Sequence, residues 1–347
     1  METAKRQGRG RRAAVLLVSA VVLLLLFFVS LTLGRYSVPL ADVVRILHHR
    51  FWKLFGVQTP ETWTAFMENA VVNIRLPRIV MAMLVGCSLS AAGATFQGVF
   101  RNPMASPDIL GASSGAAFGA ALAILLGCSS QFITGFAFLG SILTVVLVFA
   151  IAQHAPGQRT VNLILAGIMV GSLFSAGTSY LKLVADPTNQ LPAITYWLLG
   201  SLSGTRLSAI PVAVLPMTVG LVPLLLLRWR LNVLSLGESE ARALGVNTDL
   251  LRAALILCAT LITAAAISVS GVIGWVGLVI PHLSRKLIGS DNRGLLPCSM
   301  LVGAAFLLIV DDVSRNLLAT EIPIGILTAV IGAPFFIYLL LRKEKTL

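Results

Sequence analysis

Charged residues are scarce in this chain of 347 residues. Asp, Glu, Lys and Arg together make up 12% of it, against roughly 25% in a typical soluble domain. Hydrophobic residues make up 57% and occur in long runs, such as Val15 to Leu33. A soluble protein of this size still needs a polar shell, and about 20 apolar residues match the thickness of a bilayer. The deficit of charge therefore argues against a soluble enzyme and predicts an all-α, polytopic membrane protein.

Cysteine and lysine are also few. The cysteines number four and lie far apart without any Cys-x-x-Cys, so they show neither a metal-ligand spacing nor a disulfide framework. None of the lysines stands in the Gly-x-x-x-x-Gly-Lys-Ser/Thr pattern that binds nucleotide phosphates. The chain is therefore not expected to hydrolyse ATP through a P-loop, and we expect no cofactor and no metal site.

Acidic residues are almost missing from the apolar runs. A proton- or sodium-coupled carrier usually carries such residues deep in its spans, and only Asp311 and Asp312 come close. Arg315 follows them by four and three residues, a spacing that allows ion pairing on one helix face. Ion pairing is the favoured interpretation, and a secondary carrier stays as a remote alternative.

The apolar runs and the breakers between them predict about ten spans in a single domain, 1–347. The basic stretch before the first run resembles the start of a signal peptide, but the run is longer than a signal core and lacks a clear cleavage site. We interpret it as a retained span. The sixth span holds four prolines and is expected to be a re-entrant piece followed by one helix. The expected spans are 13–34, 70–98, 106–127, 132–153, 160–184, 192–227, 250–270, 272–289, 295–317 and 323–341.

The net charge of +12 is gathered at the ends of these runs, which indicates membrane orientation rather than nucleic-acid binding. A basic N-terminus and an even number of spans place both termini in the cytoplasm, including Arg342, Lys343 and Lys345. The segment after the first span is an exception, because it is basic yet expected outside. It carries Arg35, Arg45, Arg50, Lys53, Arg75 and Arg78. It is either a tolerated exception in a long loop or a docking face for an acidic partner.

Two local patterns admit more than one interpretation. Glycines recur at four-residue spacing in 111–119, 167–171 and 200–204, which favours close helix packing in lipid. Gly111-Ala112-Ser113-Ser114-Gly115 matches Gly-x-Ser-x-Gly, the nucleophile pattern of hydrolases. The strand-turn-helix setting of that motif is absent from an all-helical chain, so an intramembrane serine protease is a second remote alternative. His282 is expected to pack or hydrogen-bond rather than to bind a metal.

The most informative polar stretch is 229–249, which is cytoplasmic in this topology. Gly237 and Gly245 bound a helix-favouring segment that starts at Glu238. We interpret 231–244 as two short helices that are joined at a glycine and lie across the inner face. Such a capped element favours docking of a partner over a plain solvated loop.

At this stretch the chain resembles the FecCD/BtuC-like permeases of type II ATP-binding-cassette (ABC) importers, which take up ferric siderophores, haem and cobalamin. The resemblance covers about 73–342, and its motifs occur in the family's order. Met104 and Ser106 stand where the family more often has leucine and an acidic residue. The motifs are 74–78, 93–97, 102–107, 110–115, 165–167, 236–238, 274–282, 321–325 and 332–334.

The resemblance implies a ten-span subunit of a bacterial cytoplasmic (inner) membrane importer. Its partners would be ABC ATPase subunits, a periplasmic or lipoprotein substrate-binding protein, a second permease copy or close paralogue, and membrane lipid, with no nucleic acid. It implies that Arg75, Arg78 and Arg315 dock the binding protein. It also implies a coupling element with Leu236, Gly237, Glu238, Ala241, Leu244 and Gly245, and a cytoplasmic gate with Asn102, Met104, Thr160, Val161 and Asn162. The expected cargo is an iron–siderophore complex, with cobalamin or haem as the alternative.

Overall fold

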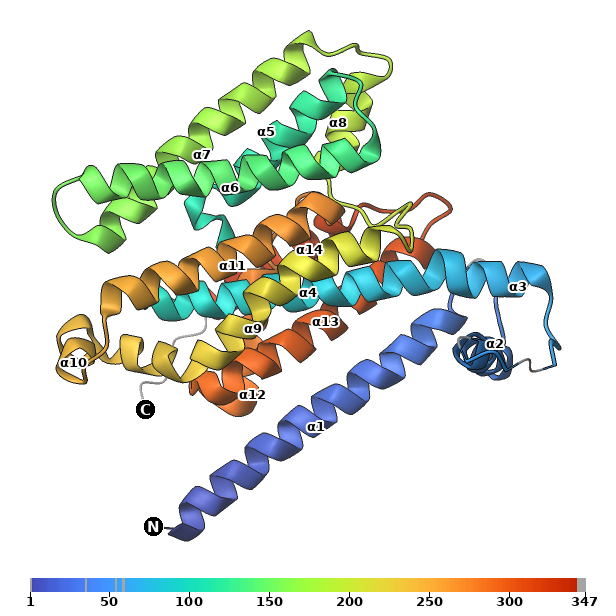
Figure 1. Ribbon diagram of the computed structural model, residues 1–347, viewed down its shortest axis with the longest axis horizontal. Helices are drawn as coiled ribbons and strands as arrows, with labels where there is room; N and C mark the ends of the chain where they lie inside the picture. Colours follow the sequence, from blue (N-terminus) through green and yellow to red (C-terminus); the bar gives the residue numbers. More distant parts are fainter. Residues whose placement is uncertain (1, 35, 54, 58–59, 342–347) are drawn as a thin grey trace.

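The computed structural model describes residues 2–34, 36–53, 55–57 and 60–341, and within these ranges all regular elements are helices. Long helices lie side by side in one bundle, with α5, α6 and α7 forming a layer along one edge and α1 lying at the opposite edge (Figure 1). Arg35 and the C-terminal residues Arg342, Lys343 and Lys345 lie outside the described residues.

Ten helical segments of this bundle correspond to the ten predicted spans. Within the described residues, seven of them are long and apolar enough, by length and composition, to cross a membrane. The helices α5, α12 and α14 are shorter. The fold prediction is confirmed. The bounds are α1 Glu2–Thr32, α4 Leu76–Val99, α5 Ala112–Leu125, α6 Ser130–His154, α7 Arg159–Val184, α9 Ala209–Leu236, α11 Thr248–Ser270, α12 Val276–Ile288, α13 Asn292–Asn316 and α14 Ile324–Leu341.

Short elements cluster at the two ends of the bundle. Figure 1 looks down the axis of α2 while α1 and α4 run across the page, so α2 lies crosswise at one end. The small helix α10 lies at the other end. The first end also holds α3, which continues without a break through η1 into α4. The short elements are α2 Leu40–Lys53, α3 Ala65–Asn69, η1 Ala70–Arg75, η2 Pro107–Leu110, α8 Gln190–Leu198 and α10 Glu238–Ala243.

The wide turn η1 has a cause in the sequence. Pro77 lacks the N–H that would close the helical turn before it, and the helix takes a π-helical turn over Ala70–Arg75 instead of breaking. The helix axis therefore continues from Ala65 to Val99. This continuity positions Arg75 and Arg78 near the start of the buried helix α4, at the end of the bundle that holds α2.

The sixth span is broken, as its prolines predict. The short helix α8 is followed by an irregular stretch, and only then does α9 run through to Leu236. Gly200 and Gly204 lie in this stretch with φ values of 71° and 74°, which favour glycine. Our interpretation of these two glycines as a helix-packing pair was therefore wrong.

The other glycine pairs do hold helices close together. A Cβ on Gly115 would lie 2.4 Å from the carbonyl oxygen of Gly140, so α5 and α6 touch through their backbones. An even closer approach joins α4 to α12, where a Cβ on Gly93 would lie 1.8 Å from the Gly277 oxygen. Such contacts replace the hydrophobic driving force that lipid does not supply.

The segment before α10 corrects a second prediction. Residues 231–236 continue α9 and do not form a separate short helix. Leucine and valine keep the helix going until Gly237, whose φ of 146° ends it. One short helix, α10, therefore stands where two were expected.

Candidate functional site

The predicted coupling element is the short helix α10 with a tight turn on each side, which connects α9 to α11. Gly237 and Gly245 take positive φ values of 146° and 77° on either side of α10, so both turns favour glycine. Ala241 is buried and anchors the element. Leu236 and Leu244 are 61% and 63% exposed at its two ends. The side chain of Glu238 lies outside what the structure describes.

Polar contacts join α10 and its flanking turns to the neighbouring helices. Arg242 Nε donates to Thr248 Oγ1 at the start of α11, at 3.2 Å. Asp249 in turn pairs with Arg159, the first residue of α7, at 3.0 Å. A displacement of α10 would therefore be transmitted to α7 through two side-chain contacts, Arg242 with Thr248 and Asp249 with Arg159. The exposed leucines offer an apolar surface to a partner at this end.

The predicted gate residues lie near the same end, in the connection after α4 and in the first turn of α7. Asn102 Oδ1 accepts from the N–H of Met104 at 2.9 Å, and Met104 itself is exposed. In the connection between α6 and α7, the carbonyl oxygens of Ala155 and Pro156 accept from Asn162 Nδ2, in the first turn of α7, at 2.9 and 3.2 Å. Thr160 is half-buried and Val161 is exposed. Within the described residues no hydrogen bond or ion pair joins the two connections.

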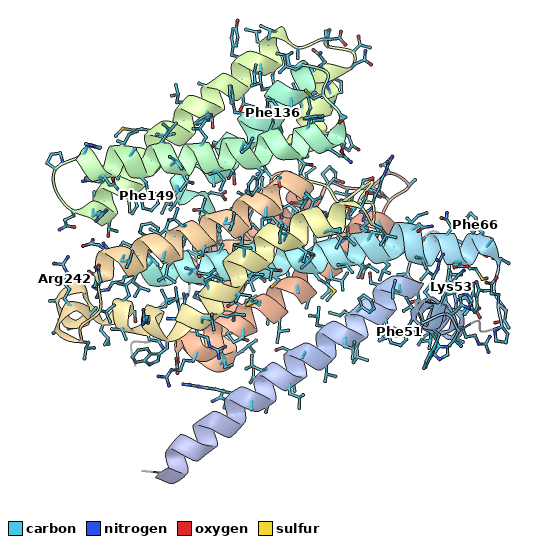
Figure 2. The ribbon with its side chains drawn as sticks, in the orientation of Figure 1. Phe51, Lys53, Phe66, Phe136, Phe149 and Arg242 are labelled. Atoms are coloured by element: carbon cyan, nitrogen blue, oxygen red, sulfur yellow. The ribbon has the colours of Figure 1, made fainter. Side chains whose placement is uncertain are left out.

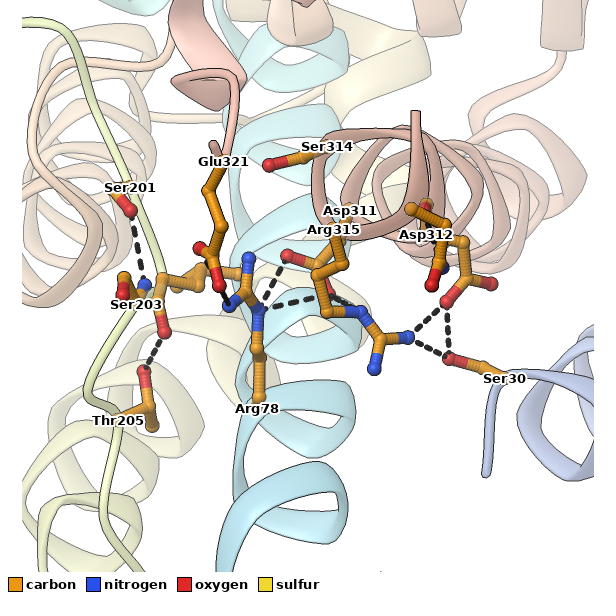
Figure 3. A network of polar contacts seen from close by, with 12 residues as sticks. Ser30, Arg78, Ser201, Ser203, Thr205, Asp311, Asp312, Ser314, Arg315 and Glu321 are labelled. Atoms are coloured by element: carbon orange, nitrogen blue, oxygen red, sulfur yellow. Dashed lines mark hydrogen bonds and ion pairs between the residues drawn. The ribbon is translucent and has the colours of Figure 1, made fainter. Parts of the chain in front are cut away.

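The three arginines of the predicted docking site lie together at the end that holds α2, but their side chains are largely buried and already have partners within the chain. Arg78 donates from Nε to Asp311 at 2.9 Å and from Nη1 to Glu321 at 2.8 Å. Arg315 pairs with Asp311 at 3.3 Å and also with Asp312, as its spacing predicted. Figure 3 shows these groups converging from α4, α13 and the stretch before α14.

The network extends to α1 and to a third arginine. Ser30 donates to Asp312 at 2.6 Å and accepts from Arg315 at 2.8 Å, which ties α1 to α13. Arg75 donates to the carbonyl oxygens of Leu31, at 2.7 Å, and of Tyr36. Leu31 lies in the last turn of α1, where carbonyl groups lack a partner within the helix, and Tyr36 lies in the segment that follows it. The three arginines therefore hold α1, α4 and α13 together at this end of the bundle.

Sequence patterns could reveal only part of this network. The pairing of Arg315 with Asp311 and Asp312 is local and was predicted from spacing. Arg78 and Asp311 are 233 positions apart, and no single-sequence signal joins them. Arg78, Asp311 and Arg315 have side chains 7%, 0% and 10% exposed, which the short motif around Arg78 does not predict.

A groove of about 380 Å³ lies between η2, the start of α5, and α7. Its polar lining includes Asp108, Ser114, Ser172 and Ser175, and Ser175 donates to Ser114 at 3.2 Å. Ser113, the serine of the hydrolase-like pattern, donates to Asp108. Sequence reasoning missed Asp108: it falls within the expected span 106–127, but only Asp311 and Asp312 were considered as acidic residues, and the structure places Asp108 in the short helix η2 before α5.

Comparisons with known proteins bear on these sites. A sequence profile described as the FecCD transport family matches residues 22–342. The molybdate import system permease protein MolB of Haemophilus influenzae is 40% identical over 91% of this chain and 92% of its own length. A protein of Helicobacter pylori strain 26695, named as a probable iron chelatin transport system permease, is 43% identical over 79% of this chain and 83% of its own.

A solved structure is also similar. It is an inward-facing ABC transporter assigned to the metal-chelate type, with a TM-score of 0.84 and 39% identity. The match covers 94% of this chain and 99% of that one. The likeness therefore extends over nearly the whole chain.

Proposed function

This chain belongs to the FecCD transport family and is a permease subunit of an ABC importer, a transport protein and not an enzyme; from that premise we propose that it carries an iron–siderophore complex across the bacterial cytoplasmic membrane. The observation that supports coupling to a partner ATPase is α10, a glycine-bounded surface helix with exposed Leu236 and Leu244 at its two ends; the cargo is argued separately below. Exposed leucines on a polar surface indicate a protein partner.

An ATPase is the partner that this surface fits. The sequence contains no P-loop lysine, so the energy for uphill transport comes from another subunit. Leu236, Gly237, Glu238, Ala241, Leu244 and Gly245 would form the contact. Closure of the ATPase dimer on ATP would move α10, and the chain Arg242, Thr248, Asp249 and Arg159 would carry that movement to α7.

The groove on α7 supports a pathway shared with a second permease. Polar groups such as Asp108 and Ser172 are costly against lipid, so this face is better satisfied by water and a facing subunit. Met104, in the connection after α4, and Val161, in the first turn of α7, are exposed at the inner end. We propose that they form the gate there with Asn102, Thr160 and Asn162. A second copy of this chain or a close paralogue would complete the pathway.

The outer end remains our proposed dock for a substrate-binding protein. Arg75, Arg78 and Arg315 balance the three carboxylates of Asp311, Asp312 and Glu321. An acidic residue of the binding protein would therefore compete with internal partners rather than meet free cations. Glu321 is the most exposed carboxylate that Arg78 contacts, and its displacement would give the binding protein access to Arg78.

Orientation follows from charge. Basic residues concentrate at the end that holds α10, so we propose that this end and both termini face the cytoplasm. The crosswise α2 then lies at the outer surface. This orientation agrees with docking of the ATPase on one end and of the binding protein on the other.

The cargo is the finer part of the proposal. A relative named for iron chelatin and a structure of the metal-chelate type both support a metal chelate. Further relatives are named for cobalamin and for hemin, which keeps cobalamin and haem as the alternative, and MolB is named for molybdate. We rank the siderophore complex first because the family that this chain resembles most often carries it, and one relative is named for iron chelatin.

Competition for uptake tests this ranking. Vesicles that contain the assembled importer would be given radiolabelled ferric siderophore with a tenfold excess of cobalamin, hemin or molybdate. We expect ATP-dependent accumulation of the iron that none of the three competitors reduces by more than about twofold. Uptake of one competitor in place of iron would refute the siderophore assignment while leaving the importer assignment intact.

A further inference from the structure

A basic pocket of about 340 Å³ lies at the inner end of the bundle, between the first turns of α1 and the end of α12. Four cationic side chains line it, Arg11, Arg12, Arg285 and Lys286. Its remaining walls are apolar, with Val15 on α1 and Leu287 and Ile288 on α12. None of these residues belongs to the proposed coupling, gate or docking sites.

The positive charge of this pocket is largely uncompensated. Arg12 pairs with Asp291 at 2.5 Å, and Arg285 donates to the neutral amide oxygen of Gln97 at 2.6 Å. Neither Arg11 nor Lys286 has a carboxylate partner in the part of the chain that the structure describes. Four cations therefore face one acid, and gathering them in one cavity is unfavourable unless an anion joins them.

The place of the pocket indicates where that anion comes from. The apolar part of α1 begins directly after Arg12, and Leu17 and Val18 one turn further are exposed to the surroundings of the bundle. The pocket thus lies at the depth of the inner headgroups, with apolar walls on the membrane side. Basic pockets between spanning helices at this depth suit phosphate-bearing headgroups.

We propose that this pocket binds the phosphate of an anionic phospholipid from the inner leaflet. Arg11 and Lys286 contact the phosphate oxygens directly. Arg285, held by Gln97, supplies a fixed third charge, while Val15 and Leu287 contact the first carbons of the acyl chains. The bound lipid joins α1 to α12, two helices that share no direct ion pair among the described residues.

Lipid binding to the purified full-length chain in neutral detergent tests the proposal. Native mass spectrometry would measure the affinity for phosphatidylglycerol, for phosphatidylcholine and for inorganic phosphate. The variant Arg11→Gln/Lys286→Gln removes the two unpaired cations. Arg228→Gln/Arg230→Gln is the matched control, because it removes the same charge from the inner end of α9 outside the pocket.

We expect the chain to select phosphatidylglycerol over phosphatidylcholine, and the double variant to bind it roughly 30-fold more weakly, about fivefold for each cation. Lys286→Gln alone, at an exposed side chain, should give the fivefold loss without disturbing the fold. The control should stay within about threefold of the unmodified chain. Equal binding of the two lipids, or an equal loss in control and double variant, overturns the proposal. Binding of inorganic phosphate without selection between the lipids would make the pocket a small-anion site instead.

Discussion

Replacement of Asp311 by asparagine tests whether buried ion pairs hold α1, α4 and α13 together. Asp311 is fully buried and accepts from Arg78 at 2.9 Å, with Arg315 at 3.3 Å. The substitution keeps the shape of the side chain and removes its charge. Arg78 and Arg315 would then face each other across a neutral amide in a site that excludes water.

The expected cost can be worked out from the remaining partners. Breaking a buried ion pair from one side costs about 3–5 kcal/mol, because it leaves an uncompensated charge. Arg78 would keep Glu321 and Arg315 would keep Asp312, so we expect the lower end, about 3 kcal/mol. At roughly 2 °C for each kcal/mol, the melting temperature of the purified chain should fall by about 6 °C.

Asp249→Asn is the matched control. Asp249 is 44% exposed and pairs with Arg159 at 3.0 Å at the end of the bundle that holds α10, and exposed pairs of this kind contribute about 0–1 kcal/mol. Thermal unfolding of both variants in the same detergent would compare the two sites. Equal shifts for Asp311→Asn and Asp249→Asn would refute the view that buried ion pairs hold α1, α4 and α13 together.

Three further predictions address packing, coupling and the pathway. Gly93→Ala should destabilise the chain by about 1–3 kcal/mol, because its Cβ would lie 1.8 Å from the Gly277 oxygen, whereas Gly135→Ala, with nothing within 4 Å, should not; equal thermal shifts would contradict the backbone contact. Leu236→Ala/Leu244→Ala should lower ATP-driven uptake at least tenfold with little change in the melting temperature, since both side chains are exposed; unchanged uptake would remove the coupling role. Ser172→Cys should be joined by a bismaleimide to the facing permease, whereas Leu24→Cys, on the exposed face of α1, should not; equal cross-linking would argue against a pathway along α7.

Hydrophobic runs predicted the bundle well because each span must satisfy its backbone internally and present apolar side chains to lipid. The ten segments follow from this constraint alone. The break in the sixth span also followed from local chemistry, since prolines and glycines act within a few residues of themselves. Helix ends were less certain, and the extension of α9 to Leu236 shows why. Leucine and valine within 231–236 let the helix continue beyond the predicted span, and no glycine or proline before Gly237 marks an earlier end.

Contacts between distant segments could not be predicted in the same way. The burial of Arg78 depends on Asp311 and Glu321, more than 200 positions away. The motif that contains Arg78 therefore indicated a surface role, while the structure places its guanidinium inside an ion network. The groove at Asp108 and the basic pocket at Arg11 could not be predicted for the same reason, because each is lined by residues of helices that are not neighbours in the sequence.

Transport by the reconstituted chain tests the central claim most directly. The account predicts that vesicles with this permease alone accumulate no ferric chelate, and that addition of the ATPase subunits, the binding protein and ATP makes accumulation against a gradient possible. Uphill accumulation by the permease alone would contradict it, because the driving force would then lie within this chain.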